Sequence, residues 1–149
     1  MKIKNKTFKV KTKEKLDFID VTDKIKKFVS KTNIEDGLVN IQTLHTTAMI
    51  LINENEPLLI KDIKRSLEQI APENVDYNHD NFEVRTVNMC KGECANGHAH
   101  CKAVYLTPTN TLNLIDSELQ LGKWQRIFFL ELDRPRSRKF QIQVMGGIV

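Results

Sequence analysis

The chain has 149 residues, of which 40% are apolar and 28% are charged, so a single domain of this length can bury a core and keep a polar surface. No segment approaches the ~20 consecutive apolar residues that a membrane-spanning helix needs. The basic N-terminus also lacks the apolar stretch of a signal peptide. We therefore expect a cytoplasmic protein without a membrane partner.

The net charge of +4 is concentrated in two basic segments. Seven lysines lie within residues 2–15, and Arg134, Arg136, Arg138 and Lys139 form a second cluster. Such segments can attract phosphorylated metabolites or nucleic acid, or can simply form a solvated face. No helix-turn-helix, RNP or zinc-finger pattern is present, and one Trp and two Tyr supply no base-stacking stripe. Nucleic acid is thus the weaker expectation.

The first half of the chain predicts three strands and two helices. Residues 8–11 alternate in polarity as a strand does, and Asp20 or Thr22 then caps a helix. Residues 38–44 and 48–52 form two apolar strands, which the short turn between them predicts to be a hairpin. Pro57 begins the second helix, which ends at residues 71–72.

The second half opens with a long segment, residues 73–97, that has little periodicity; a loop of that length is usually functional or mobile. Strand patterns follow at residues 99–106, 111–115, 124–132 and 139–145. Together these elements predict one α+β domain over residues 1–149, with two main helices and either a largely antiparallel sheet or two packed sheets.

Histidine is scarce, and its placement is the strongest signal of a site. His45 lies at the end of a predicted strand, and His79 lies in the long loop beside Asp80. His98 and His100 are two residues apart in a predicted strand, where both would point to one face. Two imidazoles on one face can hold a metal ion if a third ligand joins them. The alternative is a pair of surface or hydrogen-bonded histidines.

Carboxylates, amides and thiols offer further candidates. Glu54 follows a predicted strand and is the best acidic candidate, whereas Asn55 and Glu56 are explained by capping of the helix at Pro57. The three cysteines, with spacing C-x3-C-x6-C, suit reduced structural thiols, a zinc cluster or a redox-sensitive pair. No dinucleotide, P-loop, HExxH or G-x-S-x-G pattern is present.

Several motifs, in order along almost the whole chain, resemble the YjbQ-like family. They are His45-Thr46-Thr47-Ala48, Ile52-Asn53-Glu54-Asn55, the tract from Ala71 to Asp80, Asn96-Gly97-His98-Ala99-His100, Leu119 to Gln125, Glu131 to Arg136, and Val144-Met145-Gly146. The resemblance implies an α+β fold with a β-sandwich-like core, a homotrimer, and a polar pocket between subunits. It also implies thiamine-phosphate synthase activity, a transferase reaction that joins a pyrimidine methyl diphosphate to a thiazole phosphate and releases pyrophosphate.

Carried over residue by residue, the resemblance assigns three kinds of role. The expected metal ligands, for a divalent ion such as Zn²⁺ or Mg²⁺, are His45, His98 and His100. The expected catalytic residues are His79, Asp80 and Glu54. The expected ligands of a phosphorylated small-molecule substrate are Thr46, Thr47, Asn53, Asn96, Gln125 and Arg136. Trp124, alone on a predicted strand, is expected to pack in the core.

The chain departs from the family pattern at four places, one of which is Arg126, where the family usually has a small residue. Lys123 replaces the threonine of the family's Gly-Thr-Trp-Gln motif, and Arg134 replaces the glycine of its Gly-Pro-Arg motif. Residues 85–94 also differ from the family's usual loop. These changes bear on substrate range. The competing hypothesis is therefore a homotrimer that binds a metal or a phosphorylated metabolite without catalysis.

Overall fold

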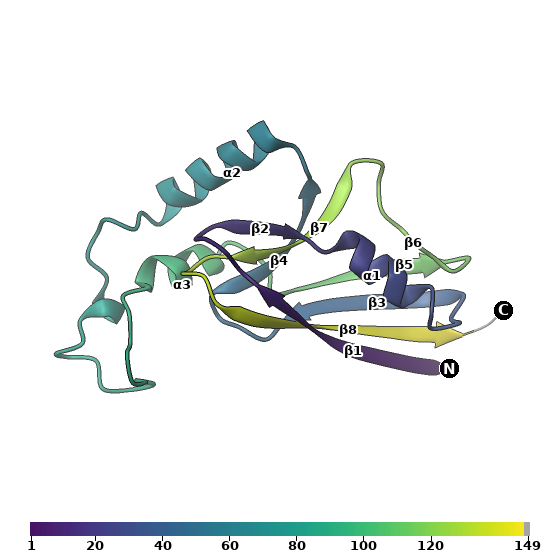
Figure 1. Cartoon of the computed structure of the whole chain (residues 1–149), viewed down its shortest axis with the longest axis horizontal. Coiled ribbons are helices and arrows are strands. Elements are labelled where there is room, and N and C mark those ends of the chain that lie inside the picture. The colour runs from purple at the N-terminus through teal and green to yellow at the C-terminus, as the bar shows by residue number, and fades with distance from the viewer. Residues whose placement is uncertain (148–149) are drawn as a thin grey trace.

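The computed structural model describes residues 1–147, which form two antiparallel sheets and three α-helices (Figure 1). The larger sheet has five strands, in the order β1 (Lys2–Lys11), β8 (Ser137–Gly147), β3 (Asp36–Thr43), β5 (Thr109–Ile115) and β6 (Glu118–Leu119). The smaller sheet has the order β2 (Asp17–Asp20), β7 (Gln125–Glu131) and β4 (Ala48–Glu54). The predicted α+β class is confirmed.

The two sheets bury a shared core because their strands alternate. Ile41 pairs with Ile142 across β3 and β8, and both side chains are fully buried in the same cluster as Ile50, Ile127 and Phe129 of the smaller sheet. Helix α1 (Thr22–Val29) adds Ile25 and Val29 to this cluster, as its apolar periodicity predicts. The two sheets therefore form a sandwich, and α1 covers part of the five-stranded sheet that the three-stranded sheet does not reach.

The other face of the smaller sheet is also buried. Helices α2 (Pro57–Ile70) and α3 (Gly97–Ala103) supply Leu67 and Ala99 to a second cluster that contains Leu130 and Leu132. Strand β7 is therefore covered on both faces, which explains its continuous apolar run from residue 127 to 130. The segment between α2 and α3 extends beyond the sandwich and contains the short 3-10 helix η1 (Asn78–Asp80) (Figure 1).

Two sequence-based predictions about the strands are wrong. Strands β3 and β4 do not form a hairpin, because residues 44–47 carry the chain from the larger sheet to the smaller one. Residues 97–103 form helix α3, whereas a strand was expected from residue 99 to 106. The apolar residues of this segment are compatible with a strand or a helix, and the burial of Ala99 against α2 and β7 favours the helix.

Two predictions about the second helix, its start at Pro57 and its cap at Glu56, are confirmed. Helix α2 begins at Pro57 and ends at Ile70, and Glu56 caps it by accepting hydrogen bonds from the N–H groups of Leu58 at 2.8 Å and Leu59 at 2.7 Å. Within residues 1–147, no helix is both long enough and apolar enough to cross a membrane. The predicted domain also includes residues 148 and 149, which lie outside the described residues.

Candidate functional site

A buried ion pair fixes the end of the sandwich where the β3–β4 turn meets the β7–β8 loop. Arg138 binds Glu131 through two hydrogen bonds, Nε–Oε2 at 2.7 Å and Nη2–Oε1 at 2.6 Å. Both side chains are almost fully buried, and Thr12 and Thr47 supply further hydrogen bonds to them. Each charge is thus compensated, and the two loops are held in one geometry.

Asp133 forms the centre of a polar group next to this ion pair. Its carboxylate accepts a hydrogen bond from Asn96 Nδ2 at 3.0 Å and pairs with Arg134 and Arg136. Two atoms in this group, Asn96 Oδ1 and Arg136 Nε, are buried and form no hydrogen bond with any residue from 1 to 147. Because a buried polar atom without a partner is costly, this acceptor and this donor indicate where a polar ligand can bind.

His79 and His100 lie side by side at the same end. Their ring centroids are 4.6 Å apart, with the ring planes at 64°. Burial, and then the neighbouring His79, lower the pKa of His100, whereas Asp133 opposes this shift. His100 is therefore neutral near pH 7, with one ring nitrogen able to donate and the other able to accept a hydrogen bond.

Asp80 holds the N-terminus of α3. Its Oδ1 accepts hydrogen bonds from the N–H groups of Asn96 and Gly97, both at 2.9 Å, and its Oδ2 lies 3.2 Å from Gly97 N. A Cβ on Gly97 would lie 2.5 Å from Tyr77 Cβ, so this close approach requires glycine. The Asp80 carboxylate is thus engaged with the helix, and a catalytic role for His79 and Asp80 stays a prediction.

His98 points away from His100, because residues two apart on a helix lie on nearly opposite sides. Its Nδ1 is 3.1 Å from Nζ of Lys102, which also donates to the carbonyl of Ala71 at 2.7 Å and lies 3.2 Å from Glu68 Oε1. The ammonium of Lys102 is fully buried and can only donate, so His98 Nδ1 accepts. The proton of neutral His98 is then on Nε2, which faces Glu73 Oε1 at 3.9 Å.

His45 is half-buried in the β3–β4 turn. Its Nε2 accepts a hydrogen bond from the N–H of Lys139 at 2.9 Å, which leaves Nδ1 as the donor in the neutral ring. Burial, and then Arg138, lower the pKa of His45. Thr46 is exposed beside it, whereas Thr47 is buried and accepts a hydrogen bond from Arg138 at 2.9 Å.

The three histidines expected to bind a metal do not form one group in a single chain. The expectation that His98 and His100 share a strand face is wrong, because they are on a helix, and Nδ1 of His98 and Nε2 of His45 are already engaged. Between residues 1 and 147, no three His, Cys, Asp or Glu side chains are arranged to hold a metal ion. All three cysteines are exposed and free. Metal binding by His45, His98 and His100 stays a prediction that this arrangement does not support.

A second polar group lies at the opposite end of the smaller sheet. Asn53 and Glu54 pair with Arg126 and Gln125 across β4 and β7, and β4 places them ~20 Å from the β3–β4 turn at ~3.3 Å per residue. Gln125 Oε1 accepts a hydrogen bond from Gly122 N at 2.7 Å, and Asn53 Oδ1 accepts one from Glu54 N at 2.8 Å. One chain therefore does not bring these residues to the histidines.

Trp124 belongs to this second group, and the expectation that it packs in the core is wrong. Its side chain is 63% exposed, with Lys123 Nζ 4.7 Å from the ring centroid. The residues here surround a cleft of about 490 Å³, lined by Asp20, Glu54, Asn55, Glu56, Lys123, Trp124 and Arg126. Arg126 pairs with Asp20 at 2.8 Å. An exposed Trp beside a lysine and carboxylates suits a ligand or another chain.

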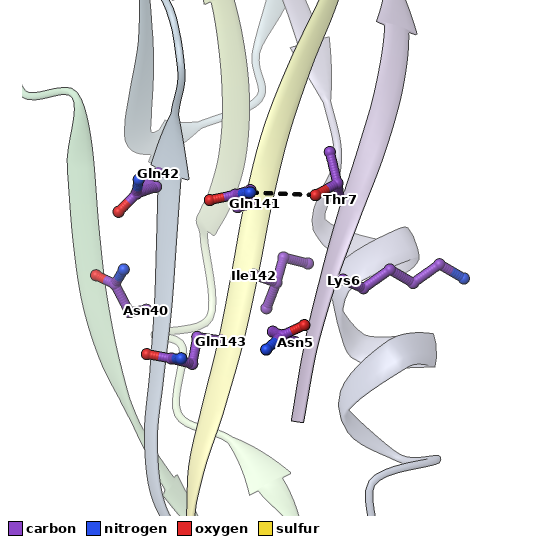
Figure 2. A pocket seen from close by; sticks show the side chains of 8 residues that line it. All are labelled: Asn5, Lys6, Thr7, Asn40, Gln42, Gln141, Ile142 and Gln143. Atoms are coloured by element: carbon purple, nitrogen blue, oxygen red, sulfur yellow. Dashed lines mark hydrogen bonds between the residues drawn. The ribbon is translucent and has the colours of Figure 1, made fainter. Parts of the chain in front are cut away.

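A second cavity, of about 370 Å³, lies on the outer face of the larger sheet (Figure 2). Side chains of Asn5, Asn40, Gln42 and Gln143 surround it, and Gln141 Nε2 donates to Thr7 Oγ1 at 3.2 Å (Figure 2). Apart from Lys6, which also lines the cavity, the polar groups are uncharged amides and a hydroxyl, which can bind a ligand by hydrogen bonds but do not act as acids or bases. The end of the sandwich that carries His45, His79, His100, Asp133 and Arg136, called the histidine end below, is the better candidate for chemistry.

Sequence reasoning missed four residues of the histidine end: Asp133, Glu131, Arg138 and Lys102. Glu131 and Asp133 lie in one of the family motifs and Arg138 lies in the second basic cluster, but neither pattern assigns them a role in the site. Lys102 resembles any helix lysine, and only the burial of α3 beneath α2 shows its role. No signal in the sequence reports that burial.

Comparison with known proteins places this architecture in a described family. The family model for the UPF0047 protein YjbQ-like family matches residues 6–147. A UPF0047 protein of Methanothermobacter thermautotrophicus is 32% identical over 98% of this chain and 94% of its own length. YugU of Bacillus subtilis, also a UPF0047 protein, is 33% identical over 95% of this chain and 98% of its own length.

Solved structures agree with this assignment. A YbjQ-like protein of unknown function from Sulfolobus solfataricus has a TM-score of 0.86 at 28% identity and covers 97% of this chain and 98% of its own. A hypothetical protein from Aeropyrum pernix has a TM-score of 0.84 at 30% identity, over 96% of this chain and 98% of its own. This chain therefore belongs to the UPF0047 protein YjbQ-like family.

Proposed function

We propose that this protein binds a phosphorylated small molecule at the histidine end of the sandwich and acts there as a transferase of the thiamine-phosphate synthase type. The observation that carries the binding step is the pair of buried, unpartnered atoms Arg136 Nε and Asn96 Oδ1 beside Asp133. A ligand with both acceptor and donor groups would satisfy them. The specific reaction comes from the family resemblance.

The charges around this group favour an anionic ligand. Arg134 is 44% exposed and Arg136 is 32% exposed, so both guanidinium groups keep donors free beyond their contacts with Asp133. Planar guanidinium groups match phosphate oxygens with two hydrogen bonds each. Neutral His100 and the nearby His79 can donate further hydrogen bonds without repelling the ligand.

The same groups suit the proposed reaction. The thiazole nitrogen would form a bond to the methylene carbon of the pyrimidine, while the bond from that carbon to the diphosphate oxygen breaks and pyrophosphate leaves. Arg134 and Arg136 would stabilise the negative charge that grows on the leaving group. His100 would donate a hydrogen bond to it. This role does not require the three-histidine metal centre, which a single chain does not form.

A second copy of the chain would complete the site. Glu54, Asn53 and Gln125 lie at the other end of β4 and β7, so they reach the histidines only if another subunit presents them. A cyclic homotrimer, which the resemblance implies, would repeat this contact three times. The divalent metal, if bound, would likewise need ligands from more than one chain.

One observation favours the alternative, a homotrimer that binds a phosphorylated metabolite without catalysis. Asp80, an expected catalytic residue, uses both carboxylate oxygens to hold α3. A carboxylate whose oxygens already accept hydrogen bonds from a helix N-terminus is poorly placed to act as a general acid or base, which leaves ligand binding as the role of the site.

Pyrophosphate release and binding distinguish the two functions. The untagged protein is incubated with the pyrimidine methyl diphosphate and the thiazole phosphate, with and without Mg²⁺ or Zn²⁺, and pyrophosphate is measured. Calorimetric titration with inorganic pyrophosphate follows binding alone. Turnover that Arg136→Ala lowers at least about tenfold supports the transferase, since a charged hydrogen bond is worth that much. Binding without turnover supports the alternative.

Arg65→Ala is the matched control. Arg65 is an exposed arginine of α2 whose one ion-pair partner among residues 1–147 is Asp62, at 2.6 Å. Its loss should leave binding and turnover unchanged. Equal effects of Arg65→Ala and Arg136→Ala, or no binding of either phosphate compound, would refute the proposed site.

A further inference from the structure

Strand β1 is an edge of the larger sheet, and among the strands of residues 1–147 it pairs with β8 alone (Figure 1). In an antiparallel pair, alternate residues direct their N–H and C=O groups toward the neighbour and the others direct them outward. Thr12 N donates to Arg136 O at 3.0 Å, in the same register as the β1–β8 ladder. The odd-numbered residues of β1, from Ile3 to Lys11, therefore present free main-chain groups to one side.

This edge is lined with lysines. Lys2, Lys4 and Lys6 alternate on the face that also carries Phe8, and Lys9 and Lys11 lie on the other face. None of these five lysines pairs with an acidic residue between positions 1 and 147. Two copies of this edge would bring lysine against lysine, so the charge disfavours self-association.

Helix α1 adds to the charge and leaves a small apolar cleft. The cleft, of about 130 Å³, is lined by Lys6, Phe8, Lys24, Lys27, Phe28 and Lys31. Phe8 and Phe28 meet edge to face with centroids 6.1 Å apart, and Phe8 stacks on Phe140 at 5.3 Å. Lys6 Nζ and Lys24 Nζ lie 4.9 and 5.9 Å from the Phe8 centroid.

The size of the cleft narrows the class of ligand. A volume of about 130 Å³ accepts one aliphatic side chain, whereas the lysine ammonium groups occupy the space above the Phe8 ring where a nucleobase would stack. The free main-chain groups of β1 match another extended polypeptide. The lysines match carboxylates on such a segment.

We propose that β1 binds an extended acidic peptide segment of a partner protein by strand addition. The segment would extend the five-stranded sheet by one strand, with its carboxylates on the lysines and one aliphatic side chain in the cleft between Phe8 and Phe28. The proposed contact uses none of the histidines and neither Arg134 nor Arg136, so the inference does not depend on the proposed function.

The test is fluorescence anisotropy with a labelled ten-residue peptide in which glutamates alternate with threonines around one central leucine. We expect saturable binding that weakens about tenfold between 50 and 200 mM salt, because surface charges are screened over ~10 Å. A peptide with proline in place of each threonine loses those main-chain N–H donors and cannot form a regular paired strand, so it should bind at least about tenfold more weakly. Equal binding of the proline peptide would overturn strand addition.

Two test variants, each with its own control variant, locate the contact on β1 and α1. Lys6→Glu/Lys24→Glu should weaken binding at least about tenfold, since it replaces attraction by repulsion at the cleft. Lys61→Glu/Lys91→Glu, which reverses two exposed lysines elsewhere, is the control for net charge. Asn5→Pro removes one outward N–H and should weaken binding, whereas Asn5→Thr should not. Equal loss in both double variants would overturn the assignment to β1.

Binding of other polyanions shows whether β1 prefers an acidic peptide to nucleic acid or lipid. Single-stranded DNA and anionic lipid vesicles of matched charge should bind more weakly than the acidic peptide at 150 mM salt. Tighter binding of either one would overturn the proposal in favour of that class of partner.

Discussion

Glu131 and Arg138 are both buried, and each satisfies the charge of the other at the base of the histidine end. Loss of one partner leaves an uncompensated buried charge. We expect Glu131→Gln to lower the free energy of unfolding by about 3–5 kcal/mol. Urea denaturation followed by circular dichroism measures the change.

The control for this pair is a more exposed ion pair that also involves a residue of β7. Arg126 binds Asp20 at 2.8 Å but is one-third exposed, so Arg126→Ala should cost only about 1 kcal/mol or less. Similar losses in both variants would show that Glu131 and Arg138 do not form the buried pair described above.

Three histidines with lowered pKa values should each make the folded protein less stable as the pH falls. Burial lowers the pKa of His45, His98 and His100 below 6.5, so the unfolded chain binds more protons than the folded chain as pH falls through this value. Stability should therefore decrease from pH 7 to pH 5, above the range where most carboxylates titrate. Denaturation midpoints at pH 5, 6 and 7 measure this slope.

A variant isolates the histidine contribution. His45→Asn/His100→Asn removes two of the three titrating groups and should flatten the dependence between pH 7 and pH 5. A slope as steep as that of the unchanged protein would assign the dependence to other groups.

At the scale of elements, Asp80 couples η1 to α3 and so fixes the long segment between α2 and α3. Asp80→Ala removes the acceptor for the N–H groups of Asn96 and Gly97, and a lost helix cap costs about 0.5–2 kcal/mol. We expect faster amide exchange in α3 than in the rest of the sandwich. Hydrogen exchange with mass spectrometry measures it.

The amide replacement separates capping from catalysis. Asp80→Asn keeps an oxygen acceptor but cannot transfer a proton, so α3 should stay protected. Loss of turnover in Asp80→Asn with a protected helix would restore Asp80 to the catalytic role that the sequence predicts. Asp76→Ala, at an exposed position in the same segment, should change neither property.

At the scale of the whole molecule, the two polar groups at opposite ends of β4 and β7 predict a site shared between subunits. Light scattering after size exclusion should give three times the chain mass of 17.2 kDa. Monomers at micromolar concentration would contradict the trimer and leave each polar group on its own.

Mixing inactive variants tests the shared site directly. His100→Ala and Glu54→Ala would each disable every site in a homotrimer. After the two are unfolded and refolded together, about a quarter of the sites should combine an intact His100 with an intact Glu54 from the neighbouring subunit. Recovered binding or turnover supports the shared site, and no recovery places both residues in one subunit or outside the site.

The sequence alone determined most elements of the fold. The alternation in β3 and β8, the apolar face of α1, and Pro57 with Glu56 at the start of α2 are local signals, because each follows from side-chain periodicity or from capping. The scarcity and placement of histidine singled out the four histidines, and the family motifs added the β-sandwich-like core.

Tertiary structure decided what these residues can do. Residues 99–103 are helical because Ala99 is buried against α2 and β7, and that turn of helix separates His98 from His100. Residues 44–47 cross between sheets, which places His45 near Arg136 and Arg138 and leaves Glu54 at the far end of β4. Burial and pairing between distant segments produce these arrangements, and local sequence patterns do not encode either one.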